Sequence, residues 1–292
     1  MYFVGIDAGG TKTDFLLCDE DKNEIKSLTL GAGNPNDIGI EACISLLSQG
    51  LDEVCGSITP NAVFAGVSGG GYGENAARIR EYLQTRFPHS VVDNGTDALN
   101  LIYCSESSGT VGALICGTGT GIFIRKDGKL YRFGGWGHLF DNGGSAYDVG
   151  RDAISRLLLS EEMGDDASAT PLCSLLLDRL GATAHEAINS FYKKGKSYIA
   201  SFAPIVFEAD SMGDMAARRI IESNVQTVAE RLSYVKSTVG DVEEIICAGG
   251  LFKSKIFFEL LSEASEIKLT LLDVPPVRGA CNRAIALAGI KK

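Results

Sequence analysis

The stretch YFVGIDAGGTKT, from Tyr2 to Thr13, joins an apolar run to an aspartate and a pair of glycines. An apolar run of this kind predicts a buried strand, and the glycines predict the tight turn in which it ends. Apolar residues at 15–17 predict a second strand, which a charged turn over 19–23 connects to a third strand ending at Leu30. The chain therefore opens with strand, glycine turn, strand, turn and strand.

The same unit returns roughly 110 residues further along the chain, a spacing far beyond the 20–50 residues of solenoid repeats. Residues 111–116 (VGALIC) predict a strand, 117–121 (GTGTG) a glycine turn, and 122–125 the next strand. A hairpin turn at Asp127–Gly128 leads to a third strand over 129–133. A unit repeated once at this scale indicates a duplicated domain.

The rest of the chain alternates helical spacing with short apolar strands, which predicts an α/β fold. A chain of 292 residues is long enough for two hydrophobic cores. We expect an N-terminal domain over 1–115 and a C-terminal domain over 116–292, with a helical insertion over 146–240. For the terminal helix over 279–288, the sequence leaves open whether it packs on the first domain.

The composition excludes several classes of partner. The net charge of −10 argues against nucleic acid and against an anionic membrane surface, since either would require a basic face. The eight cysteines show no C-x-x-C spacing, so they predict neither a zinc ribbon nor a thioredoxin-type site. Reduced thiols, no signal sequence and no apolar run of bilayer length predict a cytoplasmic protein.

The first glycine turn, residues 9–12, is not a Walker A loop, because Thr11 stands where the lysine should follow. One interpretation is a tight hairpin that needs a positive φ at Gly9 or Gly10. The other is a cradle of backbone N–H groups that binds phosphate oxygens. The motif alone favours neither interpretation.

The second glycine turn favours the phosphate cradle. Two such turns, at 9–12 and 117–121, would hold a polyphosphate from both sides if they faced each other across a cleft. In the first turn, the hydroxyls of Thr11 and Thr13 would be extra donors. Asp7 would lie near Mg²⁺ and bind it through water.

Residues 66–70 (GVSGG) match the G-x-S-x-G nucleophile elbow, with a predicted strand before and a predicted helix after. An esterase with Ser68 as nucleophile is therefore one interpretation. The chain has only three histidines and no H-G-G-G oxyanion sequence, and it is rich enough in glycine to produce the match by chance. A turn at the end of a strand is the other interpretation.

Asp97 stands where a predicted strand gives way to a helix, so it is either a helix N-cap or a functional carboxylate at the strand's carboxyl end. The stretch 134–147 (GGWGHLFDNGGSAY) holds the only tryptophan and five glycines. A loop this rich in glycine favours a ligand wall over simple packing. We expect His138 to be structural.

Together these pieces resemble the BadF/BadG/BcrA/BcrD ATPase family, and within it the N-acetylglucosamine kinases. The run GGWGH at 134–138 is the most specific part of the resemblance, which extends over most of the chain. The resemblance implies two ribonuclease-H-like domains of the actin-like ATPase type around a central cleft that holds ATP and a sugar. We also expect a homodimer.

The motifs and the resemblance give two sets of candidate residues. The set for ATP is Asp7, Gly9, Gly10, Thr11, Lys12, Thr13, Gly117, Thr118, Gly119, Gly249, Gly250 and Ser254. The set for the sugar is Asn34, Ser68, Gly69, Asp97, Gly135, Trp136, Asp141 and Asn142. The resemblance implies phosphate contacts from Thr11 and Thr118, and an adenosine border at 249–254.

The chain departs from the family at 141–143, where DNG stands in place of the first three residues of the usual G-D-E-G-S. Asn142 thus replaces an aspartate that contacts the sugar. A site with less negative charge would repel an anionic sugar less, and Gly143 would supply room. We expect a substrate range that extends from N-acetylglucosamine to N-acetylmuramate. Alternatively, Asp141 takes over the role of the missing carboxylate.

The resemblance implies transfer of the γ-phosphoryl group of ATP, with Mg²⁺, to a sugar hydroxyl whose proton Asp97 accepts as general base. Ser68 would then position the sugar. Three other functions stay open: the Ser68 esterase, an activator-type ATPase of the same family, and a sugar sensor without catalysis. The activator would carry an iron–sulfur cluster, which the scattered cysteines do not favour.

Overall fold

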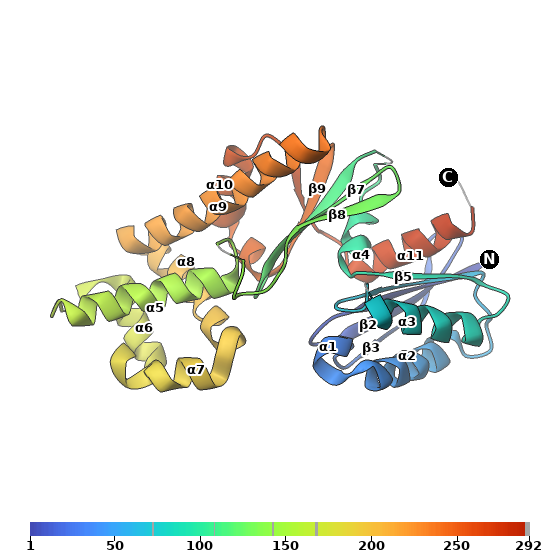
Figure 1. The fold of residues 1–292 in the computed structure, drawn as a ribbon, viewed down its shortest axis with the longest axis horizontal. Helices are drawn as coiled ribbons and strands as arrows, with labels where there is room; N and C mark the ends of the chain where they lie inside the picture. Colours follow the sequence, from blue (N-terminus) through green and yellow to red (C-terminus); the bar gives the residue numbers. More distant parts are fainter. Residues whose placement is uncertain (72, 108, 142, 167–168, 290–292) are drawn as a thin grey trace. The chain divides into compact units, whose positions relative to one another are not determined.

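The computed structural model describes residues 1–71, 73–107, 109–141, 143–166 and 169–289. The chain forms two compact units (Figure 1). The first unit consists of Met1–Ser108 and Leu272–Lys292, and the second of Gly109–Leu271. The chain therefore leaves the first unit once and returns to it with its last helix.

A five-stranded mixed sheet forms the centre of the first unit, with strand order β3-β2-β1-β4-β5. Its strands are β1 (Tyr2–Ala8), β2 (Thr13–Asp19), β3 (Glu24–Leu30), β4 (Ala62–Val67) and β5 (Val91–Gly95). The first three strands pair antiparallel, whereas β4 and β5 extend the sheet parallel to β1. The carboxyl ends of β1, β4 and β5 consequently meet at one edge of the sheet.

Helices cover both faces of this sheet, because alternate residues of a strand point to opposite sides. Val4 and Ile6 of β1 pack with α2 (Ile40–Cys55), which follows the short α1 (Pro35–Ile38), and with α3 (Gly73–Arg86). Phe3 packs on the other face with α11 (Pro276–Leu287), beside the short α4 (Ala98–Ile102).

The terminal helix α11 lies directly against β1. At Gly5, a side chain would overlap the backbone nitrogen of Cys281 in α11. Glycine is therefore required here by the close approach of helix and strand. The question that the sequence left open has a structural answer, since α11 belongs to the first unit.

The second unit repeats the strand arrangement of the first, with strand order β10-β9-β6-β7-β8. Its strands are β6 (Val111–Cys116), β7 (Thr120–Lys126), β8 (Lys129–Gly134), β9 (Glu244–Ala248) and β10 (Leu269–Leu271). Again the first three strands pair antiparallel, and the last two are parallel to the first. The predicted duplicated α/β fold is confirmed.

The helices of the second unit build a separate core. They are α5 (Ala146–Glu162), α6 (Pro171–Leu180), α7 (Ala184–Ala200), α8 (Ala203–Ser211), α9 (Met215–Val239), the 3₁₀ helix η2 (Gly250–Lys253) and α10 (Lys255–Ala264). Apolar residues of α5, α9 and α10 pack on β6, β7 and β9. In the described part of the chain, no helix is both long and apolar enough to cross a membrane.

The sequence predicted a boundary between the two domains near residue 115, and the observed boundary lies elsewhere. Residue 115 lies inside β6, whereas the units divide between Ser108 and Gly109. The reason is that β6 is the central strand of the second sheet and is hydrogen-bonded on both sides, to β7 and β9.

The contact at Gly5 gives a test of the fold. Gly5→Ala should lower the free energy of unfolding by about 1–3 kcal/mol, because the added methyl group overlaps the backbone of α11. Urea unfolding measures this loss. In the matched control Gly31→Ala, the methyl group enters open space, so stability should change by less than about 0.5 kcal/mol. Equal stability of the two variants would contradict the packing of α11 on β1.

Candidate active site

The first glycine turn connects β1 to β2. The N–H of Gly9 donates to the carbonyl of Lys12 over 2.9 Å, and the Gly9 carbonyl accepts from the N–H of Gly33 over 2.9 Å. Neither Gly9 nor Gly10 has a positive φ. The backbone conformation of the turn therefore does not require glycine, contrary to the hairpin interpretation. A Cβ atom on either would meet its nearest neighbour at 3.5 Å, which is ordinary contact.

In the second glycine turn, between β6 and β7, the fold does not require glycine at positions 117 and 119 either. The N–H of Gly117 donates to the Gly119 carbonyl over 2.9 Å, and the Ala146 N–H donates to the Gly117 carbonyl over 2.8 Å. Neither glycine has a positive φ, and a Cβ on either would have nothing within 4 Å. Bare glycine here leaves the backbone open to close approach by a ligand.

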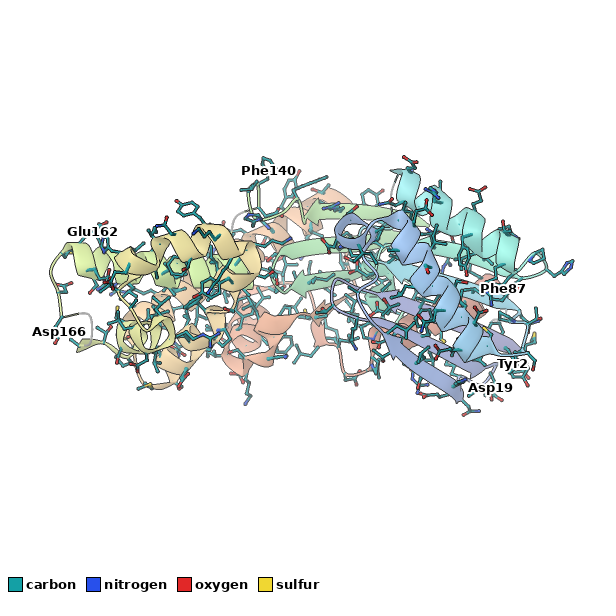
Figure 2. All side chains as sticks on the ribbon, turned by 90° about the horizontal axis from the view of Figure 1, so that it is seen from below. Tyr2, Asp19, Phe87, Phe140, Glu162 and Asp166 are labelled. Carbon is teal, nitrogen blue, oxygen red and sulfur yellow. The ribbon has the colours of Figure 1, made fainter. Side chains whose placement is uncertain are left out.

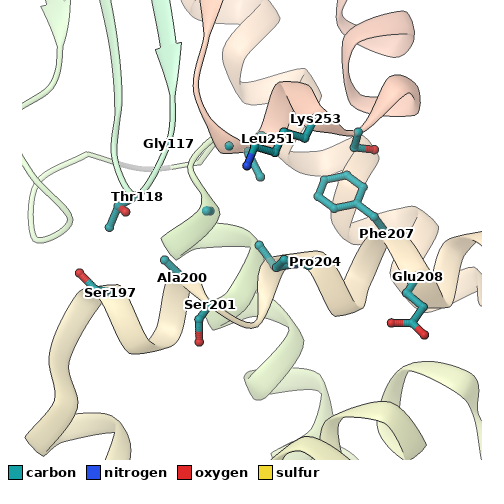
Figure 3. Close-up of a pocket in the computed structure, with 14 residues that line it drawn as sticks. Gly117, Thr118, Ser197, Ala200, Ser201, Pro204, Phe207, Glu208, Leu251 and Lys253 are labelled. Carbon is teal, nitrogen blue, oxygen red and sulfur yellow. The ribbon is translucent and has the colours of Figure 1, made fainter. Parts of the chain in front are cut away.

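A pocket of about 770 Å³ opens beside this second turn (Figure 3). Four of the predicted ATP-binding residues line it, namely Gly117, Thr118, Gly250 and Ser254. Gly119 and Gly249 are their direct neighbours in the chain. Gly249 has a φ of 117°, and a side chain there would overlap the Cys116 carbonyl, so the fold itself requires this glycine.

The opposite wall of the pocket comes from α7 and α8, and the sequence analysis did not predict it. Pro204 and Phe207 of α8 lie across the pocket from Leu251 and Lys253 of the η2 segment (Figure 3). Ser201, at the end of α7, also lines the pocket. Glu208 and Ser197 complete the polar part of the lining. In the sequence these residues show only the spacing of packed helices, which is the same whether they cover a core or a ligand.

Three predicted residues of the first unit meet at the edge where the parallel strands end. Asp7 lies in β1, Ser68 follows β4, and Asp97 follows β5. The Asp97 carboxylate accepts hydrogen bonds from the Thr96 hydroxyl over 2.9 Å, from the Ala98 N–H over 3.0 Å, and from the Ser68 hydroxyl. Asp97 is thus both the N-cap of α4 and a carboxylate at the strand edge.

Both carboxyl groups bind their protons more tightly than free aspartate does. Burial raises the pKa of Asp97, although the hydrogen bonds from Thr96 and Ser68 lower it. Burial raises the pKa of Asp7 to about 6, while a hydrogen bond from Asn100 lowers it and the charge of Asp97 raises it. A carboxylate with raised proton affinity is suited to accept a proton near neutral pH.

Asn100 in α4 holds Asp7 and was not predicted. Its fully buried amide nitrogen lies 2.5 Å from Asp7 Oδ1, and 3.3 and 3.4 Å from the carbonyls of Ile6 and Gly66. Any side chain at Gly66 would overlap the Asn100 amide. The short apolar helix in which Asn100 lies gives no sign of a contact with a strand more than ninety residues earlier in the chain.

A cluster of amides surrounds the turn after β4. Asn34 caps α1 by accepting from the Asn36 N–H over 2.9 Å. Gly69 has a φ of 71°, and a side chain there would overlap Asn34 Oδ1. Asn75 donates to Asn36 Oδ1 over 3.2 Å and to the Gly69 carbonyl over 3.3 Å. The structure therefore brings the predicted Asn34, Ser68 and Gly69 together, with two further amides that the sequence did not reveal.

The surroundings of Ser68 do not favour a hydrolase. Its hydroxyl donates to Asp97. Within the first unit, His89 precedes β5, so it lies at the edge of the sheet opposite to Ser68. In the second unit, His185 pairs with Glu161 over 2.6 Å, and the His138 ring packs edge-on against Tyr147, as a structural histidine would.

In the first turn, the structure changes the roles predicted for Thr13 and Lys12 in ATP binding. Thr13 is fully buried and its hydroxyl donates to the Gly31 carbonyl over 3.0 Å, so it is not available to a phosphate. The ammonium group of Lys12 pairs with Asp14 over 2.6 Å, although the side chain is exposed. The exposed hydroxyl of Thr11 and the backbone of the turn remain for phosphate contacts.

The loop after β8 presents predicted sugar-binding residues of the second unit. Gly135 has a φ of 76°, and its carbonyl accepts from Arg132, whose guanidinium lies 4.3 Å from the centre of the Trp136 ring. Trp136 is 64% exposed and Phe140 is 80% exposed. Figure 2 shows Phe140 at the outer end of its loop. The loop thus holds an aromatic surface out to solvent on a glycine backbone.

The end of this loop corrects the expectation for Gly143. Asp141 Oδ2 accepts from the Gly137 N–H over 2.9 Å, so it closes the loop. Asn142 lies outside the described residues. Gly143 is buried with a φ of 75°, and a side chain there would lie 2.7 Å from Thr227 of α9. Packing against α9 therefore requires this glycine, and it does not supply room for a substrate.

Comparison with known proteins confirms the predicted fold class. The sequence model of the BadF/BadG/BcrA/BcrD ATPase family matches residues 4–276. An N-acetyl-D-glucosamine kinase of Dictyostelium discoideum is 26% identical over 288 residues, which cover 89% of each chain. An N-acetylmuramic acid/N-acetylglucosamine kinase of Clostridium acetobutylicum is 28% identical over 271 residues, 87% of this chain and 86% of the relative. A crystal structure from Chromobacterium violaceum, described as a candidate N-acetylglucosamine kinase, matches with a TM-score of 0.74 at 19% identity over 98% of each chain.

The contact between Asn100 and Asp7 gives a pH-dependent test. In Asn100→Leu the charged form of Asp7 loses its donor, so the pKa of Asp7 rises further above 6. At a pH below 6, Asp7 is mostly protonated in both the parent and the variant. At a pH above the pKa of Asp7 in the variant, the variant bears a charged Asp7 that lacks the hydrogen bond from Asn100. The stability lost in the variant should therefore be larger at pH 8 than at pH 5, by about 1 kcal/mol. Urea unfolding at the two pH values measures the difference.

The control is the same substitution in an Asp7→Asn background. An amide at position 7 does not titrate, so the stability lost through Asn100→Leu should be the same at both pH values. A pH dependence that persists in this background would show that Asn100 acts on another group.

Proposed function

This chain belongs to the BadF/BadG/BcrA/BcrD ATPase family, and from this we propose that it is an ATP-dependent kinase that phosphorylates a hydroxyl of an amino sugar, with N-acetylglucosamine as the first candidate substrate. The observation that carries the proposal is the partly buried Asp97 carboxylate, which is hydrogen-bonded to Ser68 and has a raised proton affinity. The names of the two relatives support the same class of substrate.

The nucleotide would bind to the second unit. Its phosphates would contact the N–H groups of Thr118 and Gly119 and the Thr118 hydroxyl, because no side chain at the glycines blocks their approach. The adenosine would occupy the adjoining pocket, whose 770 Å³ suits a nucleoside, with its base against Pro204 and Phe207. Lys253 and Glu208 are the charged groups within this pocket.

The sugar would bind to the first unit among Asn34, Ser68 and Asp97. Asp97 would accept the proton of the attacking hydroxyl as its oxygen bonds to the γ-phosphorus and the bond to the leaving ADP breaks. A positioned base of this kind contributes roughly 10²–10⁴-fold to the rate. Ser68, already hydrogen-bonded to Asp97, would orient that carboxylate and the sugar.

Mg²⁺ would neutralise charge on the phosphates when bound. In the described part of the chain, no three His, Cys, Asp or Glu side chains are grouped so as to hold a metal ion. One carboxylate, phosphate oxygens and water form a ligand set that Mg²⁺ commonly uses. Asp7 is the carboxylate that we assign to this role, through water.

Other parts of the site bear on the rival functions. The described cysteines and acids form no cluster for iron and sulfur, so nothing in them favours an activator-type ATPase. A sugar sensor would not need Asp97 as a base.

N-acetylmuramate stays a second candidate substrate, because one relative is named as a kinase of it, although Gly143 does not make room for it. The homodimer and the cytoplasmic location stay predictions.

A panel assay tests the proposal directly. The purified chain would be incubated with ATP and Mg²⁺ and with N-acetylglucosamine, glucosamine, N-acetylmuramate or glucose, and both ADP release and sugar phosphate would be measured. We expect equal amounts of the two products with at least one amino sugar. ADP release that no sugar stimulates, with no sugar phosphate formed, would refute a sugar kinase.

Asp97→Asn should abolish turnover while largely sparing sugar binding, because the amide keeps the shape but cannot accept the proton. We expect kcat to fall by about 10²-fold or more. Calorimetry would measure sugar binding, and Ser68→Ala is the companion variant, which should retain part of the activity. A kcat near that of the parent in Asp97→Asn would rule out Asp97 as the base.

Gly119→Val should weaken ATP binding by about tenfold or more, because the side chain blocks phosphate from the backbone while the folded protein has space for it. Sugar binding, measured by calorimetry without nucleotide, should not change. The matched control is Gly31→Val, at a glycine with equally open surroundings that we assign to neither ligand. Weaker sugar binding with intact ATP binding would mean that the two ligand sites are exchanged.

A further inference from the structure

A second pocket in the first unit lies away from the proposed active site. It has a volume of about 500 Å³, and its lining includes three cysteines, Cys18, Cys104 and Cys281, and two cations, Lys22 and Arg278. Cys18 of β2 pairs in register with Phe3, at the start of β1, whereas Asp7 lies near the end of that strand. Cys18 therefore lies near the opposite end of the strand pair from Asp7, and the proposed kinase reaction has no use for this pocket.

Two of these thiols touch. Cys281 Sγ of α11 lies 3.3 Å from the carbonyl oxygen of Leu16, two residues before Cys18 on the same face of β2. The two thiol groups are hydrogen-bonded to each other. Cys18 is 1% exposed and Cys281 3% exposed, and both line the pocket, through which a small molecule would reach them.

We propose that Cys18 and Cys281 are a site of oxidative modification, at which a hydroperoxide that enters this pocket converts the two thiols into a disulfide. All eight cysteines are free in the structure, so the described state is the reduced one. The inference does not depend on the proposed kinase activity.

The surroundings assign the two thiols different roles. The hydrogen bond from Cys281 lowers the pKa of the Cys18 thiol, and the charges of Arg278 and Lys22 act in the same direction. Burial raises the pKa of the Cys281 thiol well above its ordinary value. Cys18 is therefore the thiolate that attacks first, because the thiolate is the nucleophilic form.

The reaction balances with one peroxide. The Cys18 thiolate attacks one peroxide oxygen, the O–O bond breaks, and hydroxide leaves, which gives a sulfenic acid at Cys18. The Cys281 sulfur then attacks the Cys18 sulfur, so the S–S bond forms as the S–O bond breaks and a second hydroxide leaves. The two thiol protons convert both hydroxides to water. Two thiols are oxidised by two electrons, and one hydrogen peroxide is reduced to two waters.

The other cysteines of the first unit are in different surroundings. The Cys104 thiol donates a hydrogen bond to the Asn100 carbonyl over 3.3 Å, and burial raises the pKa of this thiol to about 11. Cys43 and Cys55 of α2 are buried on the opposite face of the sheet, where burial raises the pKa of each to about 11. The reaction should therefore be selective for Cys18 and Cys281.

The new bond would tie α11 to β2. A side chain at Gly279 of α11 would overlap the Asn100 carbonyl, so the helix already lies against the residue that holds Asp7. Oxidation would fix this helix in place behind Asn100.

The experiment uses the reduced full chain and graded amounts of hydrogen peroxide. After the reaction, free thiols are counted with a maleimide in denaturant, and peptides are mapped without reduction. We expect two of the eight thiols to be lost together, and a cross-linked peptide that joins Cys18 to Cys281. Even oxidation of all cysteines, a link through Cys104, or no loss of thiols at these two positions would overturn the proposal.

Variants separate the two roles. In Cys281→Ser, or in Cys281→Ala if the first folds poorly, Cys18 should stop at the sulfenic acid, which dimedone traps. Cys43→Ser is the matched control, since it removes a buried thiol outside the pair and should leave the cross-link unchanged. Loss of the cross-link in Cys43→Ser, or no dimedone adduct at Cys18 in both Cys281 variants, would contradict the assigned roles.

Discussion

The parallel pairing of β4 with β1, and of β5 with β4, is the constraint on which the candidate site of the first unit depends. In this register Asp7 stands opposite Gly66, and Gly66 opposite Gly95. The next residues of each strand therefore leave the sheet at one edge, which brings Ser68 and Asp97 to Asp7. A slip of one residue in β1 would turn Asp7 to the face covered by α2 and α3, away from Asn100.

Electrostatics supports the view that the acids at this edge serve a ligand. Burying a carboxylate is costly, and here the hydrogen bonds from Asn100, Thr96 and Ser68 offset only part of that cost, because both pKa values stay raised. A neutral side chain in either position would relieve the repulsion between Asp7 and Asp97. Asp7 and Asp97 in their charged forms therefore do not stabilise the fold, and such carboxylates are expected where a protein binds cations or moves protons.

The sequence predicted the features that rest on local patterns. The alternation of residue types and the glycine turns are visible in short windows, so the duplicated strands were predicted. Asp7 was found near the end of the first strand, and Ser68 and Asp97 were found as polar residues that follow two others. Contacts between distant segments leave no such pattern. Asn100 reaches a strand more than ninety residues earlier, and the wall formed by Pro204 and Phe207 is visible only once α8 is placed beside η2.

The same limit explains why glycine-rich stretches were partly misread, since one residue type serves two physical situations in this chain. At Gly143 and Gly249 a positive φ and a close neighbour exclude any side chain, so the fold itself accounts for the glycine. At Gly117 and Gly119 the backbone is ordinary and the space for a Cβ is open, so the fold accounts for neither. What glycine still provides there is a stretch of backbone that no side chain covers, and a phosphate, which needs several donors at short range, is a ligand for which that matters. The assignment of the nucleotide to the second unit therefore rests on the glycines that the protein does not need for itself.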